Sequence, residues 1–318
     1  MHVHLGFDIG PEVLTTFKGS IPASVTVTTG ELPPPETQIF VTGFPAPEIL
    51  KDLKHLTTVI IPFAGLQPRS REALLEFPHL KVYNLHHNAP ATAEKAIELM
   101  LAVAKRTVPH DSSMRLGEWF PRFDKSDALQ LAGRTALVIG YGEIGKRVAK
   151  ACAALEMDVH AVKRTAPDGT DGPVKVFSTS ALPQLWTTAD VVLVCAPLTP
   201  ETTGLLDEWA IAKLPSQAIV VNIGRGGIID ERALFEALKD RRIHGAGLDV
   251  WWKYPTSQER CAPSEFPYED LDNVVMSPHN GGTVDSTEPA RFRALAELLV
   301  NLIQGTCVQR PVEPARGY

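Results

Sequence analysis

The stretch RTALVIGYGEIG, residues 134–145, joins a short apolar run directly to a G-x-G-x-x-G turn. Ala136–Ile139 predict a buried parallel strand, and the residues that follow predict a helix. At such a junction Gly140 allows the tight turn, Gly142 lets a pyrophosphate approach the backbone, and Gly145 lets helix and strand pack closely. The helix N-terminus adds unpaired N–H groups and a partial positive charge. The stretch therefore predicts a dinucleotide-binding fold rather than a plain structural turn.

Length and composition indicate a globular protein of two ordinary domains. The chain has 318 residues, of which 44% are hydrophobic and 21% charged, with a formal net charge of −6. This length allows two sizeable cores. The negative charge argues against nucleic acid or an anionic membrane as the main partner. The sequence thus favours a small-molecule ligand.

The cysteines and the N-terminus give an expectation for the compartment. No C-x-x-C pair occurs, and the four cysteines lie far apart: Cys152, Cys195, Cys261 and Cys307. This spacing favours buried thiols over disulfides or a metal site. The first residues lack a basic and apolar leader, so we expect a cytoplasmic protein. We expect His2 and His4, alternating on a terminal strand, to be exposed side chains rather than metal ligands.

The remaining sequence predicts alternating strands and helices. In the first 85 residues the expected strands are 25–28, 38–41, 58–61 and 81–85, with helices near 46–53 and 70–77. Further along, a helix over 91–106 precedes the glycine turn, and a long helix covers 285–304. Between them the expected strands are 158–162, 189–195, 218–223, 246–250 and 273–277. Strands separated by helices predict a doubly wound parallel sheet.

Several segments together resemble the D-isomer specific 2-hydroxyacid dehydrogenase family, which includes formate, glycerate and phosphite dehydrogenases. They occur in the family's order from residue 86 to 285, and read NAPATAE (88–94), GYGEIG (140–145), APLTPET (196–202), NIGRGG (222–227), GLDV (247–250) and SPH (277–279). The resemblance implies a Rossmann domain over 87–280, inserted into a smaller flavodoxin-like α/β substrate domain of residues 1–86 and 281–318. A hinged cleft would hold the nicotinamide and a small acid.

The family's two catalytic side chains have counterparts in this chain. The resemblance implies that Arg225 grips the substrate carboxylate and polarises its carbonyl, as a planar guanidinium can. It implies that His279 exchanges the proton with the substrate hydroxyl. A surface arginine and a structural histidine at a strand end are the alternative interpretations.

Position 254 departs from the family pattern. Most members have a glutamate five residues after the aspartate that corresponds to Asp249, and 249 + 5 = 254 is a tyrosine. A neutral phenol cannot raise the histidine pKa as a carboxylate would. Formate dehydrogenases have a neutral glutamine there. Tyr254 could orient His279, or the chain could bind without turnover, or a later acid could act instead: Glu259, Glu265 or Glu269.

The resemblance also names substrate and cofactor contacts. Phe63, Ala64 and Gly65 would hold the substrate carboxylate through the backbone. Asn88 occupies a position that contacts substrate in formate dehydrogenases and mainly supports the hinge in other members. After the second strand, Lys163, Arg164 and Thr165 replace the usual acid and favour NADP over NAD, although Asp168 could substitute for that acid. The other expected cofactor contacts are Gly140, Tyr141, Gly142, Glu143, Ile144, Ala196, Pro197, Thr202, Ile223, Gly224, Asp249 and Gly281.

These features predict an NADP-preferring oxidoreductase that interconverts a small 2-oxo acid, such as glyoxylate or hydroxypyruvate, with its D-2-hydroxy acid. Oxidation of phosphite or formate is a second possibility, and a nucleotide-sensing protein without turnover is a third. Arg115–Trp119 resembles the family segment that crosses to a second subunit, which implies a homodimer. An arm packed on its own domain is the alternative.

Overall fold

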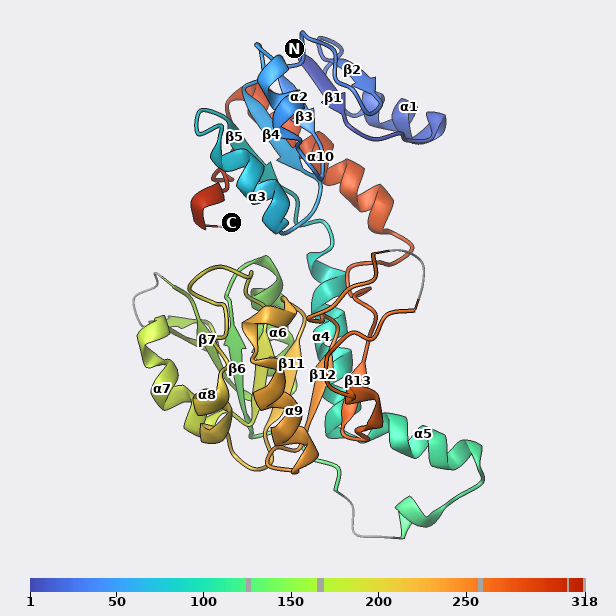
Figure 1. The fold of residues 1–318 in the computed structure, drawn as a ribbon, viewed down its shortest axis with the longest axis vertical. Coiled ribbons are helices and arrows are strands. Elements are labelled where there is room, and N and C mark those ends of the chain that lie inside the picture. Colours follow the sequence, from blue (N-terminus) through green and yellow to red (C-terminus); the bar gives the residue numbers. More distant parts are fainter. Residues whose placement is uncertain (124–126, 165–168, 257–259, 308, 317–318) are drawn as a thin grey trace. The chain divides into compact units, whose positions relative to one another are not determined.

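The computed structural model describes residues 1–123, 127–164, 169–256, 260–307 and 309–316. These residues divide into two compact units (Figure 1). Residues 1–88 and 284–318 form the first, which we call the discontinuous unit, and residues 89–283 form the second, the inserted unit. Each unit is an α/β fold around a sheet, which confirms the predicted fold class.

The discontinuous unit is built on a five-stranded parallel sheet with the order β2-β1-β3-β4-β5. This is the flavodoxin-like order. Its strands are β1 (His2–Leu5), β2 (Thr26–Thr29), β3 (Ile39–Val41), β4 (Thr58–Ile61) and β5 (Lys81–Asn84). One face packs against α1 (Pro11–Gly19) and α10 (Thr287–Gln304), and the other against α2 (Pro47–Asp52) and α3 (Pro68–Leu75).

The two N-terminal histidines contradict the prediction that they are exposed. Strand β1 lies between β2 and β3, and His2 and His4 are only 9% and 1% exposed. The hydroxyl of Thr28 on β2 lies 2.9 Å from Nε2 of His2 and 2.8 Å from Nδ1 of His4. Nε2 of His4 donates to the carbonyl of Gly30 at 2.8 Å. The rings can be buried because these partners satisfy both nitrogens of His4 and Nε2 of His2.

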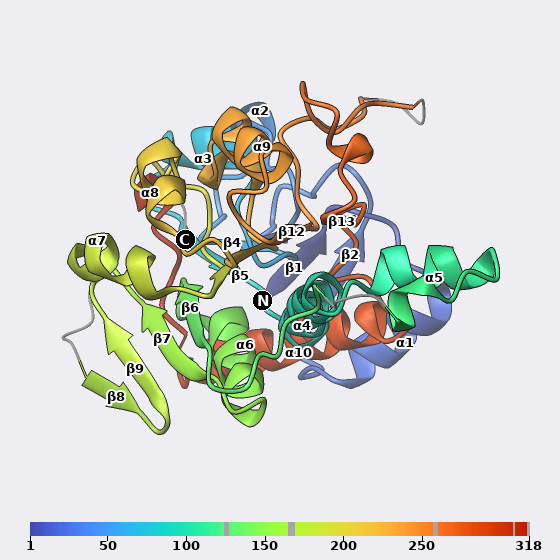
Figure 2. The same ribbon diagram turned by 90° about the horizontal axis from the view of Figure 1, so that it is seen from below.

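The inserted unit is built on an eight-stranded sheet with the order β13-β12-β11-β10-β6-β7-β9-β8. The strands are β6 (Thr135–Ile139), β7 (Asp158–Val162), β8 (Gly169–Asp171), β9 (Val174–Phe177), β10 (Val191–Val194), β11 (Ile219–Asn222), β12 (Gly245–Leu248) and β13 (Val274–Met276). All neighbours are parallel except β8 and β9, an antiparallel hairpin at the edge (Figure 2). The sequence did not predict this hairpin, because its strands are short and β8 is fully exposed.

Helices cover both faces of this sheet, as expected for a doubly wound fold. Helices α4 (Ala89–Ala104) and α6 (Glu143–Ala154) contribute to one buried core, and α7 (Leu182–Leu185), α8 (Glu208–Lys213) and α9 (Glu231–Lys239) to the other. Short 3₁₀ helices complete the described chain: η1 (Phe120–Arg122), η2 (Thr179–Ala181), η3 (Trp186–Thr188), η4 (Gly226–Ile228), η5 (Tyr268–Asp270) and, in the discontinuous unit, η6 (Pro314–Arg316).

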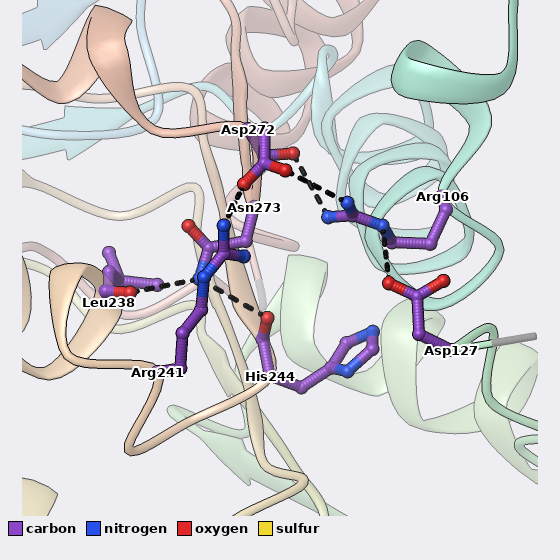
Figure 3. A network of polar contacts seen from close by, with 7 residues as sticks. All are labelled: Arg106, Asp127, Leu238, Arg241, His244, Asp272 and Asn273. Atoms are coloured by element: carbon purple, nitrogen blue, oxygen red, sulfur yellow. Dashed lines mark hydrogen bonds and ion pairs between the residues drawn. The ribbon is translucent and has the colours of Figure 1, made fainter.

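Helix α5 (Thr107–Arg115) extends away from the sheet of the inserted unit (Figure 1). Its start is anchored by Arg106, which has a left-handed backbone with φ of 56°. The Arg106 guanidinium lies 3.0 Å from the carboxylate of Asp127 and 3.1 Å from that of Asp272 (Figure 3). Asp272 also pairs with Arg241. The network therefore ties the residues that precede and follow the segment 107–126 to the body of this unit.

In the part of the chain that the structure describes, no helix combines the length and apolar character needed to cross a membrane. Across the same residues, histidine, cysteine, aspartate and glutamate side chains form no group of three or more that could hold a metal ion.

Candidate active site

The loops of the inserted unit that carry the predicted cofactor and catalytic residues lie at one edge of the eight-stranded sheet. Strands β6, β10, β11, β12 and β13 are consecutive parallel neighbours, so the loops after their carboxyl ends share that edge. The chain order reverses between β6 and β10, which makes this pair the topological switch point. In open α/β sheets, ligands bind in the crevice at such a point.

The glycine turn after β6 has the geometry that a dinucleotide needs. Gly140 has φ of +95°, and a Cβ there would lie 2.8 Å from the backbone of Ala196. A Cβ on Gly145 would lie 1.8 Å from the carbonyl oxygen of Gly140, so only glycine fits. Gly142 is the N-cap of α6 without a side-chain cap, and a Cβ there would meet nothing within 4 Å. The uncapped helix N-terminus and the open backbone fit a pyrophosphate.

Two expected cofactor contacts in this turn have side chains that are already paired. The hydroxyl of Tyr141 donates to Asp171 on β8 at 3.0 Å, and burial together with this bond raises the pKa of Tyr141 to about 12. Glu143 accepts from Arg147 one helical turn later, at 2.9 Å. The Tyr141 hydroxyl is therefore already engaged by another side chain of the protein. Ile144, in the first turn of α6, is only partly buried.

The loops after β10 and β11 pack tightly against each other. Thr202 donates to the carbonyl of Pro197 at 2.7 Å and accepts from the backbone N–H of Thr199 at 2.8 Å, which fixes the shape of the first loop. A Cβ on Gly224 would lie 2.6 Å from the carbonyl oxygen of Ala196. Ile223 is buried between the strand and this contact. These contacts hold the two loops against each other at the carboxyl edge of the sheet.

The basic pair expected to select NADP follows β7 directly. Lys163 donates its backbone N–H to the carbonyl of Phe177 on β9 and exposes its side chain, and Arg164 is partly buried. Thr165 and the alternative acid Asp168 lie outside the described residues.

Arg225 follows β11 in a turn that Asn222 holds. The Asn222 amide donates to the carbonyl of Arg225 and accepts from the N–H of Gly224, both at 3.0 Å. A Cβ on Gly226 would lie 2.3 Å from the carbonyl oxygen of Trp251, so this turn packs directly on the chain after β12. Partial burial lowers the pKa of Arg225, which the nearby Tyr254 partly offsets. The N-x-x-R spacing was the available signal for Asn222, which the sequence analysis did not single out.

His279 lies after β13 in a strained loop that Asp249 holds. The backbone of His279 is left-handed, with φ of 59°. The buried carboxylate of Asp249 accepts from the hydroxyl of Ser277 at 2.6 Å and from the N–H groups of Asn280 and Gly281 at 3.1 and 3.0 Å. Such strain of about 1–2 kcal/mol persists only where neighbouring contacts impose it. Asp249, which we expected to contact the cofactor, thus has a positioning role that the sequence did not reveal.

Tyr254 contacts His279 through its ring. The two ring centroids are 5.4 Å apart at an interplanar angle of 55°. The Tyr254 hydroxyl accepts the backbone N–H of Trp251 at 3.1 Å. Partial burial and the charge of Arg225 lower the pKa of His279, and Asp249 partly offsets this. Arg225, Tyr254 and His279 therefore form one electrostatically coupled group.

The later acids do not replace the family's glutamate in the described residues. Glu265 pairs with Lys253 at 3.2 Å, and Glu269 is an exposed residue of the 3₁₀ helix η5. Glu259 lies outside the described residues.

The expected substrate residues Phe63, Ala64 and Gly65 belong to the discontinuous unit, where they follow β4. Asn84 donates to the carbonyl of Ala64 at 2.5 Å, and the N–H of Leu85 donates to that of Phe63 at 3.2 Å. The loop is therefore held by the neighbouring strand β5. Asn88 is the last residue of this unit before α4.

Comparisons with known proteins agree with this geometry. Residues 97–281 match the model of the D-isomer specific 2-hydroxyacid dehydrogenase, NAD binding domain. A D-3-phosphoglycerate dehydrogenase from Archaeoglobus fulgidus is 38% identical over 71% of this chain and 41% of its own length. A glycerate dehydrogenase from Methylorubrum extorquens is 31% identical over 83% of this chain and 80% of its own length.

One solved structure has a similar fold over the whole length of this chain. It is a D-isomer specific 2-hydroxyacid dehydrogenase from Xanthobacter autotrophicus Py2 in complex with NADPH and MES, with a TM-score of 0.81 and 25% identity over 100% of this chain and 99% of that one. The chain spans only 41% of the Archaeoglobus relative. The family match nevertheless covers more than half of the chain, and it confirms the resemblance that the sequence motifs indicated. The protein belongs to the D-isomer specific 2-hydroxyacid dehydrogenase family.

Proposed function

We propose that this protein is an NAD(P)-dependent oxidoreductase that interconverts a small 2-oxo acid, of the glyoxylate or hydroxypyruvate type, and its D-2-hydroxy acid. The inserted unit would bind the dinucleotide and the discontinuous unit the substrate. The observation that carries the proposal is the placement of Arg225, Tyr254 and His279. They follow β11, β12 and β13, at the same sheet edge as the glycine turn after β6.

The chemistry assigned to the chain's own residues follows from their charges. The turn 140–145 would hold the dinucleotide, and the reduced nicotinamide, when bound, would supply a hydride. Arg225 stays positive despite its lowered pKa, and its planar fork would grip the substrate carboxylate and polarise the carbonyl. His279 would give the proton to the developing alkoxide from a ring nitrogen. In the discontinuous unit, the backbone N–H groups of residues 63–65 are the proposed substrate contacts.

Tyr254 has a different role in this proposal from the glutamate of most relatives. Its oxygen accepts the N–H of Trp251, so its own O–H proton can be donated. The phenol ring packs on the imidazole and limits how His279 can turn. Tyr254 therefore positions His279 sterically and supplies a neutral donor rather than a charge.

The cofactor preference proposed is NADP over NAD. Lys163 and Arg164 follow the second strand of the fold, where an acid that binds the ribose of NAD would repel a 2′-phosphate. Two cations in that place favour the phosphate. The NADPH named in the Xanthobacter complex supports this preference.

A second candidate, oxidation of formate or phosphite, is favoured by one observation, the neutral side chain at position 254. These reactions produce no alkoxide, so they do not need a histidine whose pKa is raised by a carboxylate.

The test is NADPH oxidation by the whole chain against glyoxylate, hydroxypyruvate and other 2-oxo acids, with NADP reduction by formate and phosphite in parallel. Arg225→Ala should lower kcat/KM by about 100-fold or more, because it removes charge stabilisation at the reacting carbonyl. Arg242→Ala removes an exposed arginine of the same unit and is the matched control. NADPH binding with no turnover of any compound would instead identify a nucleotide-sensing protein.

A further inference from the structure

The discontinuous unit contains a cavity of about 440 Å³ at the carboxyl ends of its strands. Residues that follow β1, β3 and β4 line it, so it lies where open α/β sheets bind ligands. Phe63, in the loop proposed to bind the substrate carboxylate, is one of these lining residues. The cavity is therefore continuous with that loop within this unit, and it offers far more volume than glyoxylate fills.

The walls of the cavity are largely aromatic. Phe7, Phe44 and Phe63 line it, and Phe44 is 64% exposed. The ring of Phe63 is held in place, because a Cβ on Gly43 would lie 2.6 Å from it and the Arg291 guanidinium lies 5.5 Å from its centroid. The cavity thus presents apolar surface and aromatic faces to its occupant.

The charged groups of the cavity are mostly acidic. Asp8, Glu31 and Glu288 line it, and Arg291 is the one cationic side chain among its described lining residues. Arg291 pairs with Glu288 at 2.6 Å, so its charge is already compensated. Asp8 and Glu31 are exposed and have no ion pair among the described residues. The cavity therefore carries a net negative charge of two.

The aromatic walls and the net negative charge together determine which chemical group the cavity can bind. A phosphate group carries about −1.5 to −2 charges at neutral pH and would face two uncompensated carboxylates. A cationic end would instead meet these carboxylates and the aromatic faces, which both attract cations. An apolar stem would replace water along Phe7 and Phe44.

We propose that this cavity binds the distal end of the substrate and selects a 2-oxo acid with an apolar stem and a cationic end over a phosphorylated one. The inference rests on the proposed function, since it assigns the substrate class to the same site. It separates this chain from the phosphoglycerate dehydrogenase among its relatives on the basis of charge alone.

The experiment compares kcat/KM of the whole chain with NADPH for two matched pairs at low ionic strength. The first pair is 2-oxo-5-guanidinopentanoate and 2-oxopentanoate, and the second is 3-phosphohydroxypyruvate and hydroxypyruvate. We expect the guanidino compound to exceed its neutral match by about 5-fold, the upper range for exposed ion pairs. We expect the phosphorylated compound to fall below hydroxypyruvate by about 10-fold.

A double variant tests whether the cavity causes this selection. Asp8→Asn with Glu31→Gln should bring both ratios close to one, because this double variant removes the two uncompensated carboxylates of the cavity. Glu12→Gln with Glu72→Gln removes two exposed charges of the same unit outside the cavity and should change neither ratio. Equal or better turnover of the phosphorylated compound, or equal ratios in the two double variants, would overturn the inference.

A binding measurement tests the cavity proposal separately from the proposed reaction. Titration calorimetry with 5-guanidinopentanoate and with 3-phosphoglycerate needs no turnover. Preferential binding of the guanidino compound, lost in the cavity variant, would support the cavity even if no 2-oxo acid reacts. Absence of any such preference would reject the cavity even if glyoxylate is reduced.

Discussion

The imidazole of His279 packs against the phenol ring of Tyr254 with 5.4 Å between ring centroids, while the Tyr254 hydroxyl bonds to the backbone of Trp251. The contact orients the imidazole without placing a negative charge beside it. Partial burial and Arg225 lower the pKa of His279 below its usual value, and Asp249 offsets only part of this. The pH dependence of the reaction should follow from this relationship.

In the proposed mechanism, reduction uses the proton of charged His279, so kcat/KM should fall as pH rises through the lowered pKa, and the loss should begin on the acid side of 6.5. Tyr254→Glu should move this limb upward by about one pH unit, because a carboxylate near an imidazole favours its charged form. The pH profile of kcat/KM with glyoxylate measures the shift.

Tyr254→Gln is the matched control, since it changes size and hydrogen bonding without adding charge. Its limb should stay near that of the unchanged protein. A limb that is already as high as that of a glutamate-bearing relative would contradict the assignment.

Asp249 should act through the loop that carries His279. Asp249→Asn replaces one acceptor oxygen by a donor, so at least one of the three bonds to Ser277, Asn280 and Gly281 is lost. We expect kcat to fall by about 10-fold, because the left-handed backbone of His279 is no longer held. Ser277→Ala removes one bond and should have a smaller effect. Equal kcat in all three proteins would show that the loop needs no such support.

The sequence predicted those parts of this site that depend on local motifs. The turn 140–145 combines a buried strand, three glycines and a helix start, and each requirement is visible in the order of residues. The positions of Arg225 and His279 within the NIGRGG and SPH segments were enough to predict both as catalytic candidates. What the sequence could not supply were partners distant in the chain, such as Asp171 for Tyr141. The burial of His2 could not be predicted from the sequence either, because it depends on the hydroxyl of Thr28 on another strand.

Cofactor preference should depend on the basic pair after β7. Replacing both Lys163 and Arg164 by alanine should raise the KM for NADPH by about 10-fold and leave that for NADH nearly unchanged, because only NADPH carries the 2′-phosphate. Lys213→Ala with Lys239→Ala removes two basic side chains elsewhere in the same unit. A lower KM for NADH than for NADPH in the unchanged protein would contradict the preference.

We propose that residues 107–123, the segment that follows α4, join two copies of the chain. Its segment presents Leu116, Trp119 and Phe123 with 76%, 56% and 77% of their surface exposed, a concentration of apolar side chains typical of an interface. Trp119→Ala with Phe123→Ala should convert a dimer into a monomer in light scattering after gel filtration. Leu32→Ala, an equally exposed site elsewhere, should not. A monomeric unchanged protein would end this proposal.

Acid should destabilise the protein through His87. Burial, with the charge of Arg291, lowers the pKa of His87 to about 4 from 6.5. The unfolded chain therefore binds more protons than the folded one in this window, and stability falls as pH drops from 6.5 towards 4. His87→Gln should flatten the pH dependence of urea unfolding in that range, whereas the exposed His55→Gln should not. A slope that His87→Gln leaves unchanged would assign the effect to other groups.

The hydroxyl of Thr28 has only one proton to share between His2 and His4. A carbonyl can only accept, so Nε2 of His4 carries hydrogen towards Gly30, and in the neutral ring Nδ1 must be the bare nitrogen. The threonine proton then points to His4, and its lone pair receives Nε2–H of His2. The three groups form a one-way chain of hydrogen bonds across β1 and β2, from Nε2–H of His2 through the Thr28 hydroxyl to Nδ1 of His4. Valine at position 28 would leave one ring without a donor and the other without an acceptor.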